Sequence, residues 1–228
     1  MVCYCDIFNR KQKQILVLAC SFPGVFMKYL AVIFSALMMV TFAEPASAQF
    51  SESYNFLKAV KERDGEEATK FLNKPGSVIV NTRDVTSGET ALHIAVARRD
   101  STWVQFLLQK GANPNIRDKQ GMTPLILATQ LRFVDGVAIM LARKARVDET
   151  NNQGETALIR AVQLRDSELV RILLSKGANP DLPDTLAGLS ARDYATRDRR
   201  ASAVLAEIVK ADAKDKPEPE GRFFGPEG

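Results

Sequence analysis

The chain has 228 residues, with 31 Lys and Arg against 27 Asp and Glu and a single histidine. Its formal net charge of +4 is too small to indicate nucleic-acid binding through charge alone. The three cysteines all lie within the first 20 residues, so the rest of the chain has no Cys/His set for zinc. Composition therefore favours neither a nucleic-acid partner nor a structural metal.

An export signal is the first recognisable pattern, at residues 27–48. Lys28 precedes an almost wholly apolar run from Leu30 to Phe42, and the small-x-small pattern cut by signal peptidase follows at Ala46-Ser47-Ala48. The run is shorter than the about 20 residues that a membrane span needs. We therefore expect cleavage before Gln49, no membrane span in the mature protein, and a periplasmic or secreted location.

The start of this leader is open to more than one interpretation. Counted from Met27 the signal has the usual length of about 15 to 30 residues, so we expect that residues 1–26 are not translated. The alternatives are an uncleaved anchor from Ile15 to Phe42 and a lipid-modified Cys20. After cleavage the chain has no cysteine and carries 27 Lys and Arg against 25 Asp and Glu, a balance that again gives no reason to expect nucleic acid.

A period of 33 residues dominates the chain from residue 85 onward. It relates four sets of positions: Gly88, Gly121 and Gly154; Thr90, Thr123 and Thr156; Leu92, Leu125 and Leu158; Ala95, Ala128 and Ala161. Units of this length cannot bury an apolar face alone, so neighbouring units must stack into one continuous core.

Each unit reads as a helix, a turn and a second helix. The recurring Thr is suited to cap the first helix, and Pro124 in the second unit stands at the first helical position, which proline favours. In the first unit, Val104, Leu107 and Leu108 give the second helix a buried stripe at i, i+3, i+4 spacing. That helix ends at Gly111, where a left-handed residue is needed.

The motifs Thr90-Ala91-Leu92-His93, Thr123-Pro124-Leu125 and Gly111-Ala112-Asn113 make the chain resemble the ankyrin repeat family. The resemblance implies an all-α repeat solenoid of stacked helix-turn-helix units with projecting β-turn loops, about five units including the terminal caps. It assigns an N-terminal capping repeat, three full repeats and a C-terminal capping repeat to residues 50–84, 85–117, 118–150, 151–184 and 185–210. Pro and Glu residues indicate a disordered tail at 211–228.

The second full repeat departs from the pattern at two positions. Lys144 stands where the neighbouring repeats have Gly111 and Gly177, and Gly136 lies inside the predicted second helix, where Gly costs about 1 kcal/mol relative to Ala. We expect this repeat to be the weakest part of the stack, and Gly136→Ala to stabilise it if the site has room.

No arrangement of side chains predicts catalysis. His93 is the only histidine, and the resemblance gives it a structural role, tying the turn to the helix start. Asp181 and Asp184 lack the glycine-spaced ligand pattern of a calcium loop, and no glycine-rich phosphate loop is present. We therefore expect no enzymatic activity, no metal site and no cofactor.

Two rows of side chains are candidate binding surfaces. The resemblance places the end of each first helix on the concave face that grips partners, which assigns protein binding to Arg98, Gln130, Leu131, Gln163 and Leu164. The two leucines could instead pack against a neighbouring helix or turn. The second row has Arg where the family usually has Gly between the helices, at Arg99, Arg132, Arg165 and Arg199.

The arginine row also has two interpretations. Stacked guanidinium groups could bind an anionic partner such as lipid phosphate or acidic polysaccharide. Alternatively, they complement the helix dipoles and solvate an edge. We expect an exported monomer that binds a protein of unknown identity, with anionic envelope components as the alternative ligand.

Overall fold

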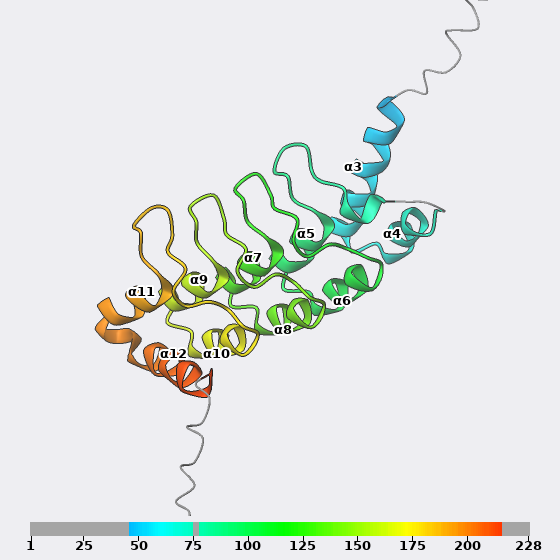
Figure 1. Cartoon of the computed structure of the whole chain (residues 1–228). Coiled ribbons are helices and arrows are strands. Elements are labelled where there is room, and N and C mark those ends of the chain that lie inside the picture. Colours follow the sequence, from blue (N-terminus) through cyan, green and yellow to red (C-terminus); the bar gives the residue numbers. More distant parts are fainter. Residues whose placement is uncertain (1–45, 75–77, 216–228) are drawn as a thin grey trace, which may run out of the picture. The chain divides into compact units, whose positions relative to one another are not determined.

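The computed structural model describes residues 46–74 and 78–215 (Figure 1). The chain divides into two compact units, residues 1–49 and 50–228, and the repeats form the second. The apolar run of the predicted signal, the alternative anchor and Cys20 lie outside the described residues. The predicted tail begins too early, because the last helix continues to Asp215.

The repeats form two layers of short antiparallel helices (Figure 1). The inner layer consists of α5 (Ala91–Ala97), α7 (Pro124–Gln130), α9 (Ala157–Gln163) and α11 (Ala191–Arg197). The outer layer consists of α6 (Ser101–Gln109), α8 (Val134–Ala142), α10 (Ser167–Ser175) and α12 (Ser202–Asp215). A further pair, α3 (Ala46–Glu62) and α4 (Gly65–Leu72), precedes them, and η2 (Ile79–Asn81) follows.

Turns project from the inner layer between successive repeats (Figure 1). We call these turns fingers, at residues 84–88, 118–121, 151–154 and 184–188. Isolated antiparallel bridges close three of them, namely Arg83 with Thr90, Thr150 with Thr156 and Pro183 with Ser190. Together with the stacked helix pairs, the fingers confirm the predicted all-α repeat solenoid.

Stacking between repeats buries the apolar face that no single repeat could bury. Each inner helix packs on the next inner helix, α5 on α7 and α7 on α9, and the outer helices pack in the same succession. Leu92, Leu125 and Leu158, which the period relates, are at most 1% exposed. Burying a leucine fully is favourable by about 1.5 to 3 kcal/mol, so the repeated leucine contributes at every joint.

The inner helices begin at the recurring Thr, as the sequence predicts. Thr123 accepts a hydrogen bond from the backbone N–H of Ile126, and Thr156 accepts one from Ile159. At the last inner helix Ser190 takes this role and forms a reciprocal capping box with Asp193. These caps satisfy backbone donors that would otherwise be orphaned at a buried helix start.

His93 is fully buried and joins the first full repeat to the second. Its Nδ1 accepts a hydrogen bond from the backbone N–H of Thr90 (3.2 Å), which leaves Nε2 as the donor to the carbonyl of Met122 (3.0 Å). Burial lowers the pKa of His93 and keeps the imidazole neutral, against the opposing influence of the Met122 carbonyl, Asp118 and Glu89. The side chain therefore has a structural role.

The outer helix α8 differs from its neighbours at its first turn. Asp100 and Asp166 cap α6 and α10 through their side chains, whereas Phe133 occupies the N-cap of α8 and makes no such bond. Gly136 lies in the first turn of α8 beside the Phe133 ring, and a Cβ added there would lie 2.3 Å from Cδ1 and Cε1 of that ring. The condition on which Gly136→Ala was expected to stabilise the repeat, room for a Cβ, is therefore not met.

The structure predicts that Gly136→Ala destabilises the protein by about 1 to 3 kcal/mol, since the buried Phe133 ring must move. In a Phe133→Asp background the ring is absent and the N-cap matches those of α6 and α10. There the same glycine substitution should become neutral or stabilising by up to about 1 kcal/mol. Urea unfolding of the four proteins in this cycle measures the coupling, and equal effects of Gly136→Ala in both backgrounds would contradict the proposed clash.

Candidate functional site

The arginine row predicted from the sequence lies at the turns between inner and outer helices. Arg99, Arg132 and Arg165 have φ values of 55°, 53° and 56°, and Arg63 has the same conformation at 61°. This left-handed region is strained for a residue with a Cβ. Arg199, which we expected to continue the row, instead begins the 3₁₀-helix η3 (Arg199–Ala201).

Three of the four left-handed arginines form ion pairs within the solenoid. Arg132 Nη1 lies 3.8 Å from a carboxylate oxygen of Asp166, and Arg165 Nε lies 2.6 Å from one of Asp198. Arg63 and Asp100 form the corresponding pair one repeat earlier, at 3.7 Å. Each of these aspartates caps the helix that follows it, so each arginine reaches from its own repeat to the helix cap of the next.

Arg99 is the exception in the row. The other arginines pair with an aspartate one repeat later, but for Arg99 that position is occupied by Phe133. Among residues 46–74 and 78–215 no carboxylate pairs with Arg99. An exposed ion pair contributes only about 0 to 1 kcal/mol, but the three pairs use guanidinium groups that an external anion would need. The anion-binding alternative therefore finds no continuous free row.

Arg98, predicted to bind a partner, also points into its own protein. Its Nη1 donates hydrogen bonds to the carbonyls of Val60 and Lys61 at the end of α3, and the guanidinium lies 5.7 Å from the ring centre of Trp103. Desolvation lowers the pKa of Arg98, and Asp100 partly opposes this effect. The side chain connects the first full repeat to the preceding helix pair.

Leu131 and Leu164 are the C-caps of α7 and α9. Both side chains are half-buried, and Leu131 packs against the core. Gln130 and Gln163, the residues before them, are exposed at the last turn of each helix. The leucines are thus partly structural, whereas the glutamines belong to a polar network on the surface formed by the inner helices and the fingers. We call this surface the inner face.

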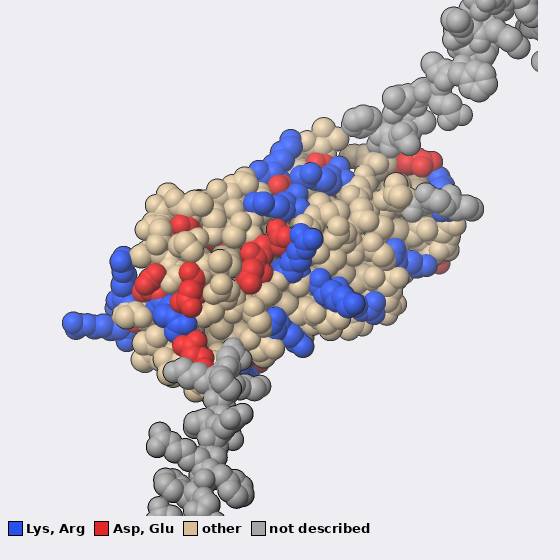
Figure 2. Space-filling view, in the orientation of Figure 1, with Lys and Arg blue, Asp and Glu red and all other residues tan. Residues whose placement is uncertain are grey.

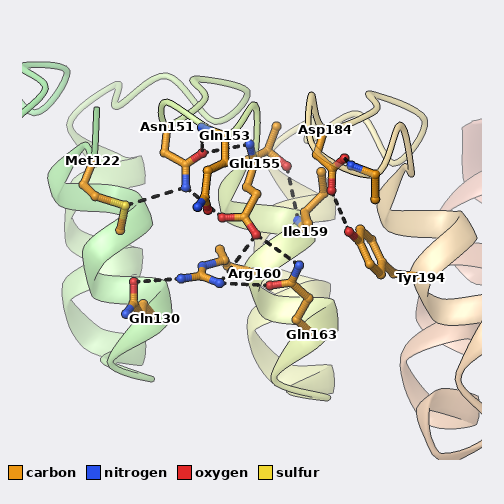
Figure 3. A network of polar contacts seen from close by, with 12 residues as sticks. Met122, Gln130, Asn151, Gln153, Glu155, Ile159, Arg160, Gln163, Asp184 and Tyr194 are labelled. Carbon is orange, nitrogen blue, oxygen red and sulfur yellow. Dashed lines mark hydrogen bonds and ion pairs between the residues drawn. The ribbon is translucent and has the colours of Figure 1, made fainter. Parts of the chain in front are cut away.

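Glu155 is the centre of this network (Figure 3). Glu155 is only 7% exposed, and its Oε2 accepts a hydrogen bond from Nδ2 of Asn151 at 2.8 Å. The other oxygen, Oε1, accepts one from Nε2 of Gln163 at 3.1 Å and lies 3.5 Å from Nη1 of Arg160. The carboxylate is therefore held by two amides and one guanidinium, as a buried charge requires.

Asn151 occupies a position where the other fingers have aspartate. Asp84, Asp118 and Asp184 each accept backbone N–H groups of their own finger, and Oδ1 of Asn151 does the same with the N–H groups of Gln153 and Glu155. Only the amide can also donate to the buried carboxylate of Glu155. The change from Asp to Asn is therefore matched to its neighbour.

An open hollow of about 370 Å³ adjoins the network. Its walls are mostly carboxamides, from Gln120, Gln130, Asn151, Asn152 and Gln153. Met122 and Arg160 complete the lining. In the part of the chain that the structure describes, no group of three His, Cys, Asp or Glu residues could hold a metal ion.

Comparison with known proteins gives the family. A model described as ankyrin repeats (3 copies) matches residues 56–151 and 92–184, together more than half of the chain. The chain belongs to the ankyrin repeat family. In terms of the family's repeats, the hollow lies between the fingers of the second and third full ankyrin repeats, at residues 118–121 and 151–154.

Individual relatives match only through short stretches. The chain is 36% identical to the human 2-5A-dependent ribonuclease over 81 residues, which are 36% of this chain and 11% of that protein. It is 49% identical to an ankyrin repeat protein of fowlpox virus (strain NVSL) over 47 residues, 21% of this chain and 14% of that protein. It is 39% identical to human oxysterol-binding protein-related protein 1 over 72 residues, 32% and 8% respectively. The chain thus spans about a tenth of the length of these relatives.

Sequence reasoning assigned Gln130 and Gln163 to a binding surface but missed Asn151, Glu155 and Arg160. The available signal in the sequence was Asn151 itself, because the corresponding position in the other fingers is an aspartate. Glu155 and Arg160 follow it within the next nine residues, but their proximity across the finger and α9 depends on the fold.

We predict that Asn151→Asp destabilises the protein by about 2 to 3 kcal/mol at pH 7, because two carboxylates would face each other in a buried site. The loss should shrink as the pH falls, since the pair can then share a proton. Asp118→Asn, the reverse change in the neighbouring finger, should cost less than about 1 kcal/mol. Urea unfolding at pH 7 and pH 5 measures both, and equal stability of Asn151→Asp and the parent at pH 7 would contradict the role of Asn151.

Proposed function

We propose that this ankyrin repeat protein is an exported, monomeric protein-protein interaction module that binds its partner on the inner face and has no catalytic activity of its own. Ankyrin repeats suggest protein binding in general, and the observation that supports this surface is the hollow beside an ordered polar network. The network fixes long side chains in advance, which lowers the entropy lost on binding. One relative is named a ribonuclease, but the match covers 11% of that protein.

The inner face also offers a surface of near-neutral composition beside the fingers. The last residues of α5, α7 and α9 are Ala97, Gln130 and Gln163, which are uncharged and exposed, whereas α11 ends at the exposed Arg197. Figure 2 shows basic and acidic side chains interspersed over the visible side of the molecule, with large uncharged areas between them. This distribution supports recognition by shape and hydrogen bonding, with a small contribution from long-range attraction.

Two matched pairs of substitutions test the binding face. Ala97→Arg with Gln153→Arg places bulky cations on the inner face, whereas Ala142→Arg with Gln105→Arg makes the same changes on the outer helices. All four positions are exposed, and Ala97 and Ala142 each end a helix, so both variants should keep the parent stability within about 0.5 kcal/mol per site.

We expect the inner pair to reduce capture of the partner from a cell-envelope extract at least about tenfold, because arginines that clash with a fitted partner remove several contacts at once. The outer pair should capture as well as the parent. Quantitative mass spectrometry of the retained proteins is the measurement. Equal capture by the two variants would rule out the inner face as the binding surface.

The signal pattern of residues 27–48 supports export. It ends with the small residues Ala46 and Ala48, so cleavage would leave Gln49 as the first residue. In the described part of the chain, no helix has both the length and the apolar character to cross a bilayer. Intact-mass measurement of protein from the envelope fraction should give a mature N-terminus at Gln49. A mass that retains Cys3, Cys5 or Cys20 would contradict this proposal.

A further inference from the structure

The guanidinium of Arg160 is held by its edges. Nη1 donates to Oε1 of Gln163 at 3.1 Å and lies 3.5 Å from the carboxylate of Glu155, while Nη2 donates to Oε1 of Gln130 at 3.3 Å. Nε is enclosed and has no hydrogen-bond partner within the described residues. Of the five N–H groups, two donate to the glutamines and one is enclosed, which leaves one on each terminal nitrogen, and Nη1 has the Glu155 carboxylate beside it.

The Arg160 side chain nevertheless remains 28% exposed beside the hollow. A guanidinium binds anions through the N–H groups in its plane and binds aromatic rings through its two faces. Because Nη1 and Nη2 each donate to a glutamine, Nη1 lies beside Glu155 and Nε is enclosed, few in-plane donors are left for a ligand in the hollow, whereas stacking on a face needs none of them. The geometry therefore favours stacking over ion pairing.

A carboxylate ligand is disfavoured for a second reason. To pair with two in-plane donors at once it would have to displace Glu155 or one of the glutamines, and it would then lie against the buried negative charge of Glu155. Like charges at such a distance repel each other. The remaining walls are uncharged carboxamides, which neither attract nor repel an ion.

Met122 adds a second aromatic-favouring group to the hollow. It follows the 118–121 finger at the register position of Glu89 and Glu155, is 7% exposed at the wall of the hollow, and its sulfur lies 3.8 Å from Nδ2 of Asn151. Sulfur and aromatic rings attract each other by about 0.3 to 1.5 kcal/mol. The volume of about 370 Å³ is near the lower end of ligand sites, about 300 to 1,000 Å³, and suits one side chain.

We infer that this hollow seats one aromatic side chain of the partner protein, stacked on the Arg160 guanidinium and in contact with Met122. The inference rests on the proposed function and specifies the chemistry of its partner. The carboxamides around the ring would then bond the peptide groups on either side of it, since an amide carries both a donor and an acceptor. Recognition of this kind depends little on ionic strength.

The test uses the purified full chain and three small probes that share the same acetyl and primary-amide ends: N-acetyl-tryptophanamide, N-acetyl-leucinamide and the α-carboxamide of N-acetyl-aspartic acid. NMR follows the Nε–Hε signal of Arg160 and the methyl signal of Met122. The tryptophan probe should give saturable shifts at both groups, with an upfield ring-current shift of the methyl. The leucine and aspartate probes should bind at least about fivefold more weakly.

Substitutions separate stacking from charge. Arg160→Lys keeps the cation beside Glu155 but removes the plane, and should weaken the tryptophan probe about five- to tenfold. Met122→Leu keeps the volume and should weaken it about two- to fivefold. Arg171→Lys makes the same change at an exposed site on α10 and should leave binding unchanged. Thermal melting verifies that each variant is folded, and Met122→Leu retains the test if Arg160→Lys is not.

Several results would overturn the inference: no saturable shift with the tryptophan probe, equal or stronger binding of the leucine or aspartate probe, or unchanged binding in both Arg160→Lys and Met122→Leu. The C-terminal residues 216–228 contain two aromatic residues, Phe223 and Phe224. Tighter probe binding after both are replaced by serine would show that the chain's own residues compete for the hollow, and would overturn the assignment to a partner. Failure here leaves the capture experiment with Ala97→Arg and Gln153→Arg standing. Failure of capture with intact probe binding would instead remove the proposed function.

Discussion

The contact between one repeat and the next is the constraint on which the whole structure depends. Each inner helix has only seven residues, too short to be stable in isolation, and its leucine and alanine face is buried only when a neighbour covers it. Polar groups within the stack must therefore be satisfied between repeats as well as inside them. His93, Arg98 and the arginines that pair with capping aspartates all bridge repeats for this reason.

At the arginine positions, several small contributions to the free energy of folding combine at the contact between repeats. A left-handed non-glycine residue costs about 1 to 3 kcal/mol, and an exposed ion pair returns at most about 1 kcal/mol. Replacing glycine also removes about 0.4 to 1 kcal/mol of unfolded-state entropy. The sum is near neutral or slightly unfavourable, so the arginines are better understood as links that align adjacent repeats than as a source of stability.

The sequence predicted the fold because the period, the Thr caps and the helix-ending glycines are local signals repeated in register. It failed where the outcome depended on how particular side chains meet in the folded chain, within one repeat or across two. The steric contact of Phe133 with Gly136, and the capture of Arg132 by Asp166 one repeat later, cannot be read from composition or spacing. The network of Glu155 was missed for the same reason, although Gln130 and Gln163 were placed on the correct helix ends.

The burial of the single histidine has a consequence for acid conditions. Burial lowers the pKa of His93, so as the pH falls below about 6.5 the unfolded chain takes up a proton that the folded chain refuses, and stability declines. The lowered pKa values of Asp84, Asp184, Asp193 and Asp198 have their effect only in more acidic solution, below the ordinary value of 3.8. His93 lies at the joint between the first and second full repeats, where Arg99 has no carboxylate partner among the described residues. Mild acidification therefore weakens the contact between the first and second full repeats. The hollow lies at the next contact along the solenoid, between the second and third full repeats.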